Sequence, residues 1–271
     1  MVMLMAPLVA VCAAAEPRVT STDTLKAGHI EFDIGVGFTR ATAEVDGPGA
    51  TIDASVLSTE MAPAIYFWAA DHFALGASVP FQLSRSVDDG RATSDGPTGA
   101  GDLGLALLYG RRAAPWLRTL AEMSVRLPTG SEELSAEAAQ VAWGGTLEFR
   151  LTDAVGLAVG LDYTLRTQGD LPADPGDAFD VQVGLPYRTE NLHVEPALVL
   201  AHTFADEGAD DGSDAIAAQV NAGYSVAPGV SITGLIGYAR LLEQTVAPGI
   251  SRQGDAVSIT LGLQYVTPKL W

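Results

Sequence analysis

Three glycines in the stretch GAGDLG fall at the spacing of a phosphate-binding loop. Gly99, Gly101 and Gly104 match G-x-G-x-x-G, a pattern in which backbone amides at the start of a helix hold a dinucleotide pyrophosphate. That chemistry requires a helix directly after the glycines. The residues that follow, LGLALLYG, alternate apolar and small side chains, which is typical of a strand. The motif therefore does not support a nucleotide site.

The stretch DEGADDGSD is rich in carboxylates, the ligands that Ca²⁺ prefers. The spacing of these acids does not match an EF-hand loop, so we expect no defined metal site. Three roles stay open: a cation-attracting mouth, contact with lipopolysaccharide through bridging divalent cations, or a plain solvated surface. The acidic outer loop consists of Asp206, Glu207, Asp210, Asp211 and Asp214.

Nucleophilic hydrolysis would require a histidine beside a serine. The chain has 4 histidines, and they are scattered. The most suitable is His202, which follows an apolar alternating stretch, but no serine lies clearly beside it on the same face of that strand. The sequence therefore predicts no catalytic residues, no cofactor and no enzymatic activity.

Composition excludes some partners and suggests a compartment. The formal net charge is -18, and only 2 of the 15 basic residues are lysine, which argues against a nucleic-acid partner. Residues 1–15 are apolar and end in Ala13 and Ala15, as a secretory signal peptide does. Residues 16–28 are then a periplasmic segment, and the mature chain has no cysteine because Cys12 leaves with the signal.

From residue 29 to residue 271, apolar and polar residues alternate in segment after segment. In VGLAVGLDYTLR, residues 155–166, every odd position is apolar and every even position is small or polar. Because successive side chains of a strand point to opposite faces, this is a strand with two different environments. Twelve such strands are expected, at residues 30–38, 61–67, 73–83, 103–109, 117–127, 141–151, 155–165, 179–187, 192–200, 216–224, 230–238 and 257–265.

Short turns and long loops alternate between these strands, as in an up-and-down antiparallel barrel. Among the expected long loops are EVDGPGATID and EQTVAPGISRQGD, at residues 44–53 and 243–255. The long loops together hold nineteen of the 33 acids but only two arginines, Arg91 and Arg252. All short turns and both termini should lie at one end of the barrel.

The composition of the polar face indicates which side of the barrel wall contacts water. It consists of Gly, Ala, Ser, Thr and Gln with scattered charges, whereas a soluble surface normally carries far more Lys and Glu. The apolar face should therefore contact lipid, which favours a closed transmembrane barrel in the outer membrane of a Gram-negative cell. Aromatic residues near the strand ends fit the interfacial girdles of such barrels: Phe67, Trp68, Phe73, Tyr109, Trp143, Tyr163, Tyr187, Tyr238 and Tyr265.

Charged residues on the polar face should point into the lumen. They form either a constriction that selects solutes or a structural network of paired charges that fills the barrel. The network comprises Asp102, Arg118, Glu122, Arg126, Glu148, Arg150, Asp162, Arg166 and Asp180, and further inward acids are Glu31, Asp33, Glu60 and Glu195.

Two short segments resemble the outer-membrane proteins named for the meta-pathway of phenol degradation. The matching residues are Gly99, Gly101 and Asp102 in GAGDLG, and residues 127–130 in VRLPTG. The resemblance implies a β-barrel that passes small, often hydrophobic or aromatic, compounds, and it supplies no catalytic residues. We therefore expect a passive outer-membrane channel or facilitator for small solutes. The alternative is a plugged barrel with a structural or surface-interaction role.

Overall fold

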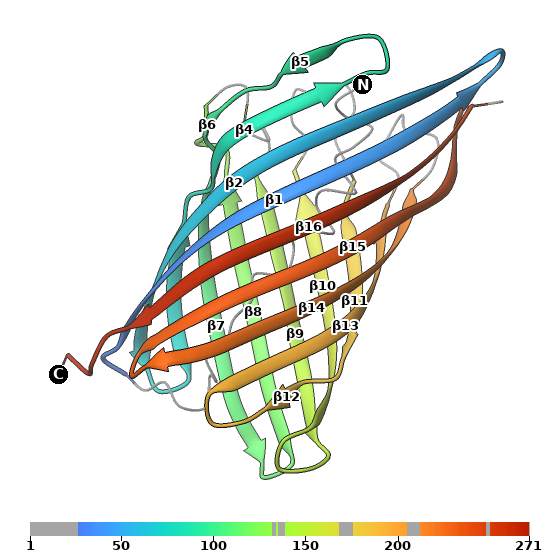
Figure 1. Cartoon of the computed structure of the whole chain (residues 1–271). Coiled ribbons are helices and arrows are strands. Elements are labelled where there is room, and N and C mark those ends of the chain that lie inside the picture. Colours follow the sequence, from blue (N-terminus) through green and yellow to red (C-terminus); the bar gives the residue numbers. More distant parts are fainter. Residues whose placement is uncertain are drawn as a thin grey trace.

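The chain folds into one antiparallel β-sheet that closes into a barrel (Figure 1). The computed structural model describes residues 27–131, 134, 139–167, 176–204, 212–247 and 250–270. The expected signal peptide, residues 1–15, lies outside these residues. Closure is direct, because β1 pairs with β2 on one side and with β16 on the other.

Sixteen strand segments lie within the described residues, and they build a wall of twelve strands. β3 and β4 continue one wall strand, β11 and β12 continue another, and β5 and β6 attach to β4. The expected twelve-stranded up-and-down barrel is confirmed. The segments are β1 (Ile30–Gly47), β2 (Ala50–Ala70), β3 (Phe73–Ser78), β4 (Phe81–Asp88), β5 (Thr93–Asp95), β6 (Gly99–Ala100), β7 (Leu103–Ala114), β8 (Leu117–Leu127), β9 (Gln140–Arg150), β10 (Gly156–Arg166), β11 (Ala178–Gly184), β12 (Tyr187–Arg188), β13 (Leu192–Thr203), β14 (Ser213–Ala227), β15 (Val230–Ala247) and β16 (Ile250–Val266).

Two of the expected long loops are strands instead. Residues 44–53 continue β1 and β2 up to a tight turn, and residues 243–255 belong mostly to β15 and β16. These hairpins project far beyond the rest of the wall (Figure 1). Past the bilayer the outward positions of β1 become polar, as at Arg40 and Glu44, while the inward Ala43 stays buried. The apolar outer face therefore ends while the backbone ladder continues. The loop prediction was wrong for that reason.

Prolines interrupt two strands that the sequence pattern presents as continuous. The expected strand 73–83 breaks between Ser78 and Phe81, at Pro80, and the expected strand 179–187 breaks after Gly184, near Pro186. Proline has no amide hydrogen to donate to the ladder. After the first break β4 pairs with β2 but not with β7, so the wall between β4 and β7 needs another closure.

The outer surface carries an apolar band between two aromatic rows. Large apolar side chains are exposed all round the wall, for example Leu198 at 60% and Leu261 at 61%. The upper row runs through the paired residues Trp143, Tyr163 and Phe179. The lower row includes the stacked pairs Trp116–Phe149 and Phe32–Tyr265. A closed barrel with this exterior is a membrane-spanning barrel of the outer-membrane type.

One expected girdle residue lies elsewhere. Trp68 points inward and is 2% exposed, because the register of β2 against β1 puts Tyr66 and Trp68 on the lumen side with Glu31. The described residues contain no helix that is long and apolar enough to span a bilayer.

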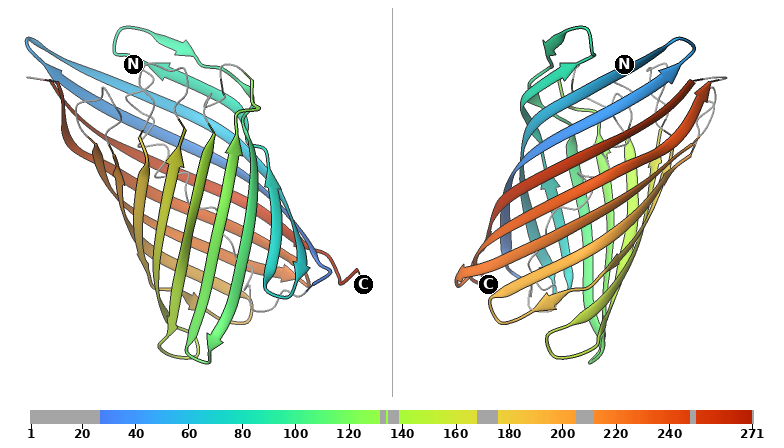
Figure 2. Two further views of the ribbon diagram at one scale, coloured as in Figure 1. Left: turned by 180° about the vertical axis from the view of Figure 1, so that it is seen from behind. Right: turned by 45° about the vertical axis from the view of Figure 1, so that its right-hand side comes forward.

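The two ends of the barrel differ, as the views from behind and from the side show (Figure 2). The tight turns after β2, β7, β9, β12 and β14 lie at one end, together with the C-terminal residues. The long hairpins and the segment from β4 to β6 lie at the other end. In outer-membrane barrels the short turns are periplasmic and the longer loops are extracellular, which orients the molecule.

The inner surface has two contrasting sides. On β1, β2 and β13–β16 the inward positions are mainly small and apolar. We call this surface the alanine wall, and its buried members are Ala41, Ala43, Ala54, Val56, Val199, Ala201, Ala215, Ala217, Ala239, Leu241 and Ala256. The opposite side, β7–β11, carries most of the lumen charges.

Candidate functional site

Three carboxylates form a row across the charged side of the lumen. Glu122 of β8 pairs in register with Gly144 of β9, Gly144 pairs with Asp162 of β10, and Asp162 pairs with Asp180 of β11. We call Glu122, Asp162 and Asp180 the acid belt. Like charges in directly paired positions are unfavourable in a sheet, so the belt is a costly arrangement that attracts cations.

Gly144 provides the space that the acid belt needs. A Cβ atom at this position would overlap the carboxylate of Asp162 and would lie 2.7 Å from the carbonyl oxygen of Leu161. The side chain of Asp162 therefore extends over Gly144, toward Glu122.

A basic layer lies four residues nearer the extracellular end, about 13 Å along the strands. Arg126 and Arg166 share it, since both pair with Gln140. The Nη1 of Arg166 donates to the carbonyl oxygen of Gly176 at 2.5 Å. The acid belt and this basic layer therefore lie at different levels along the barrel.

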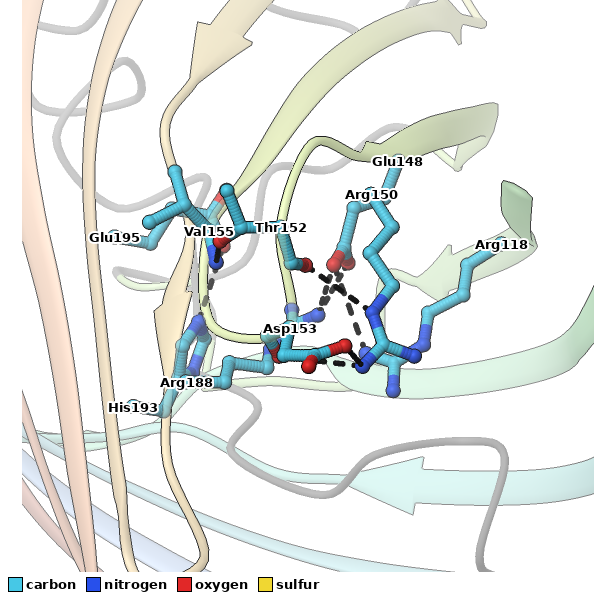
Figure 3. Close-up of polar contacts among 9 residues, drawn as sticks. All are labelled: Arg118, Glu148, Arg150, Thr152, Asp153, Val155, Arg188, His193 and Glu195. Atoms are coloured by element: carbon cyan, nitrogen blue, oxygen red, sulfur yellow. Dashed lines mark hydrogen bonds and ion pairs between the residues drawn. The ribbon is translucent and has the colours of Figure 1, made fainter. Parts of the chain in front are cut away.

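A third charged layer lies at the periplasmic end (Figure 3). Glu148 contacts Arg118, at 3.6 Å between Nη1 and Oε1, and both of its oxygens accept hydrogen bonds from Arg188. Arg150 turns to the tight turn that follows it, where its Nη2 donates to Asp153 Oδ1 at 2.7 Å.

A buried polar cluster lies beside this end, on β1, β2 and β16. Gln264 Nε2 donates to Glu31 Oε1 at 2.8 Å, and Trp68 Nε1 donates to Glu31 Oε2 at 3.3 Å. Glu31, Trp68 and Gln264 are each at most 3% exposed. Large side chains therefore fill part of the lumen at this level.

Asp102 closes the wall between β4 and β7, which do not pair with each other. Its Oδ1 accepts a hydrogen bond from the amide of Gly130 at 2.9 Å, and Thr129 Oγ1 accepts one from the amide of Leu103 at 2.9 Å. The amide of Gly101 donates to the carbonyl oxygen of Pro80 at 2.7 Å. We call the contacts between residues 99–103 and 129–131 the clasp. Asp102 is 4% exposed, so it is a wall residue as much as a lumen charge.

The clasp joins the two segments whose sequences carry the family resemblance. A family model described as "Putative MetA-pathway of phenol degradation" matches residues 37–246, which include both segments. The chain belongs to this family.

Comparison of structures supports the same fold for this member of the phenol-degradation family. The COG4313 outer membrane channel from Pseudomonas putida F1 is similar with a TM-score of 0.70 and 16% identity, covering 93% of this chain and 100% of that one. The outer membrane protease OmpT from Escherichia coli, covering 91% of this chain and 100% of that one, gives 0.45 and 12%. The CymD monoaromatic hydrocarbon channel, covering 88% of each chain, gives 0.43 and 11%. The last two values are too low to relate either activity to this chain. A search of curated proteins found no match.

The residues proposed for the acidic outer loop fall mostly outside the described part of the chain. Asp206, Glu207, Asp210 and Asp211 lie outside the described residues. Asp214 is described, and it lies on β14 instead of in a loop. Its Oδ1 lies 2.7 Å from Nδ1 of His202 on the outer face. Within the described residues, His202 contacts Asp214 and Phe204, and neither supplies a serine hydroxyl.

The structure adds inward arginines that sequence analysis missed, and three of them are relevant to the charged layers. Arg112 pairs in register with Arg118, Arg188 pairs with His193, and Arg85 pairs with Ser58. Arg112 and Arg188 each lie just past the expected end of a strand. Arg112 has the same parity as the inward Leu108 and Gly110, and this parity could have identified it. The expected strand was ended at Tyr109 because the apolar residues of the outward face end there.

Proposed function

We propose that this protein is a passive channel for small solutes, including hydrophobic and aromatic ones, with a preference for cations among charged species. The observation that carries the proposal is the two-sided inner surface of the closed barrel, in which the acid belt adjoins the alanine wall, because Asp180 pairs in register with Ala201. The acid belt attracts cations and repels anions. Membership of the phenol-degradation family and the fold shared with an outer membrane channel support passage of small compounds.

Ion selectivity in a planar bilayer tests the acid belt directly. We expect the wild-type pore to prefer cations at low salt and to lose the preference as salt rises, because screening shortens the Debye length to about 3 Å at 1 M. The variant Glu122→Gln/Asp162→Asn/Asp180→Asn should show a severalfold lower ratio of cation to anion permeability. The reversal potential in a salt gradient measures this ratio.

A matched control removes the same number of charges outside the lumen. Glu44, Asp53 and Asp88 lie on outward positions of β1, β2 and β4, beside a cavity of about 480 Å³. Neutralising these three acids should leave selectivity nearly unchanged. An anion-selective wild type, or equal effects of the two triple variants, would contradict the role of the belt.

The second candidate is the plugged barrel, and one observation favours it. Trp68, Leu235 and Leu241 are large inward side chains that are at most 2% exposed, so parts of the lumen are filled. Folded protein that gives no conductance in the bilayer would select this alternative. Outward acids such as Glu44 and Asp53 would then serve surface contacts, including lipopolysaccharide held through divalent cations.

A further inference from the structure

Four arginines gather around one small cavity at the periplasmic mouth. Arg112, Arg118, Arg150 and Arg188 line a cavity of about 100 Å³, together with only two acids, Glu148 and Asp153. The chain as a whole carries a net charge of -18, whereas the residues that line this cavity carry more positive than negative charges. We call these four residues the arginine cluster.

Strand pairing brings two arginines of the cluster together. Arg112 and Arg118 occupy directly paired positions on β7 and β8, and like charges in such positions destabilise a sheet. On the other side of Arg118 the paired residue is Glu148. One carboxylate is therefore set beside a pair of guanidinium groups by strand pairing alone.

The two acids of the cavity are already engaged. Glu148 accepts both hydrogen bonds from Arg188 while it also contacts Arg118. Asp153 binds Arg150, but its side chain is fully exposed to water, which weakens its compensating effect. The nearby Glu195 contacts His193 at 3.3 Å (Figure 3). Among the residues that line the cavity, arginines outnumber acids by four to two.

Glu148 shows what these arginines bind. A guanidinium group presents a planar set of donors that matches a carboxylate or a phosphate, and here two arginines already converge on one carboxylate. We propose that the arginine cluster binds a small oxyanion, a carboxylate or a phosphate, at the periplasmic mouth. This site is additional to solute passage, and binding there does not require the barrel to conduct.

Binding can be measured on the folded full chain in detergent micelles, without a bilayer. Isothermal titration calorimetry with sodium benzoate, sodium acetate and sodium phosphate, at ionic strength held constant with NaCl, should give saturable binding for at least one anion. The same anion should raise the unfolding temperature of the protein, because it binds only the folded state. Arg112→Gln and Arg150→Gln should each weaken binding by tenfold or more.

The matched control is Arg111→Gln. Arg111 precedes Arg112 on β7, is exposed, and faces the outside of the barrel, so its replacement should leave binding unchanged. Response to benzoate and acetate would identify the ligand as a carboxylate, and response to phosphate alone would identify a phosphate. Absence of saturable binding, or equal binding by the Arg112, Arg150 and Arg111 variants, would overturn the proposal whether or not the protein conducts.

Discussion

Replacement of Leu261 by arginine should lower the free energy of unfolding in lipid bilayers by about 2–4 kcal/mol. Leu261 is 61% exposed on the outer face of β16. Along this strand it lies midway between Tyr265, in the lower aromatic row, and Val257, which pairs with Tyr238 near the upper end of the band. Arginine there would place a charge near the bilayer midplane, where its desolvation is most costly. Urea unfolding in liposomes, followed by tryptophan fluorescence, gives the value.

The variant Leu261→Met is the control, because it keeps an apolar side chain of similar volume. It should unfold within about 1 kcal/mol of the wild type. If Leu261→Arg were as stable as Leu261→Met, this face would be in water, and the assignment of the apolar band to lipid would be wrong.

A methyl group at Gly130 should open the clasp. A Cβ atom there would lie 2.8 Å from the carbonyl carbon of Gly101 and 3.1 Å from the carbonyl oxygen of Ala100. These are backbone atoms and cannot rotate away, so the segment must shift and lose its hydrogen bond to Asp102. We expect Gly130→Ala to cost about 1–3 kcal/mol. The change should also remove protection from hydrogen exchange at the amides of Leu103 and Ser131, which donate to Thr129 and Ala100.

Gly47→Ala is the comparison for this change, since the nearest atom to its added Cβ would be 3.8 Å away. It should leave both the stability and the exchange rates at the clasp unchanged. Equal effects of the two alanine substitutions would mean that the loss comes from glycine removal in general. An unaffected Gly130→Ala protein would show that the clasp does not hold the wall together.

The sequence predicts well the part of the molecule that lies in lipid. Leu161 faces lipid and has to be apolar, whereas its neighbour Asp162 faces the lumen and can be polar. Odd and even positions along the strand therefore indicate the two sides of the wall. The ladder of β1 and β2 beyond the bilayer was missed because its outward residues are polar there, as at Arg40 and Glu44, so the lipid-facing pattern stops before the strand does. The break at Pro80 was missed because the apolar alternation continues through it.

For the candidate site, sequence gives the direction of a side chain but not its partners. Parity alone places Glu122, Asp162 and Asp180 on the lumen side. That they share one row depends on strand register, which the turns and bulges decide. Contacts such as Asp102 with Gly130 lie between segments without regular alternation, so no periodic pattern reports them.

The seam between β1 and β16 also bears on how the protein reaches its native state. It joins residues more than two hundred positions apart, in an unbroken ladder from Glu31–Val266 to Asp46–Ser251. Contacts of such sequence separation require closure of the longest loop in the chain and are slow to form. Until β16 arrives, the long edge of β1 has no partner and can pair with another chain. The last strand to be synthesised therefore controls both the rate of assembly and the period of risk for aggregation.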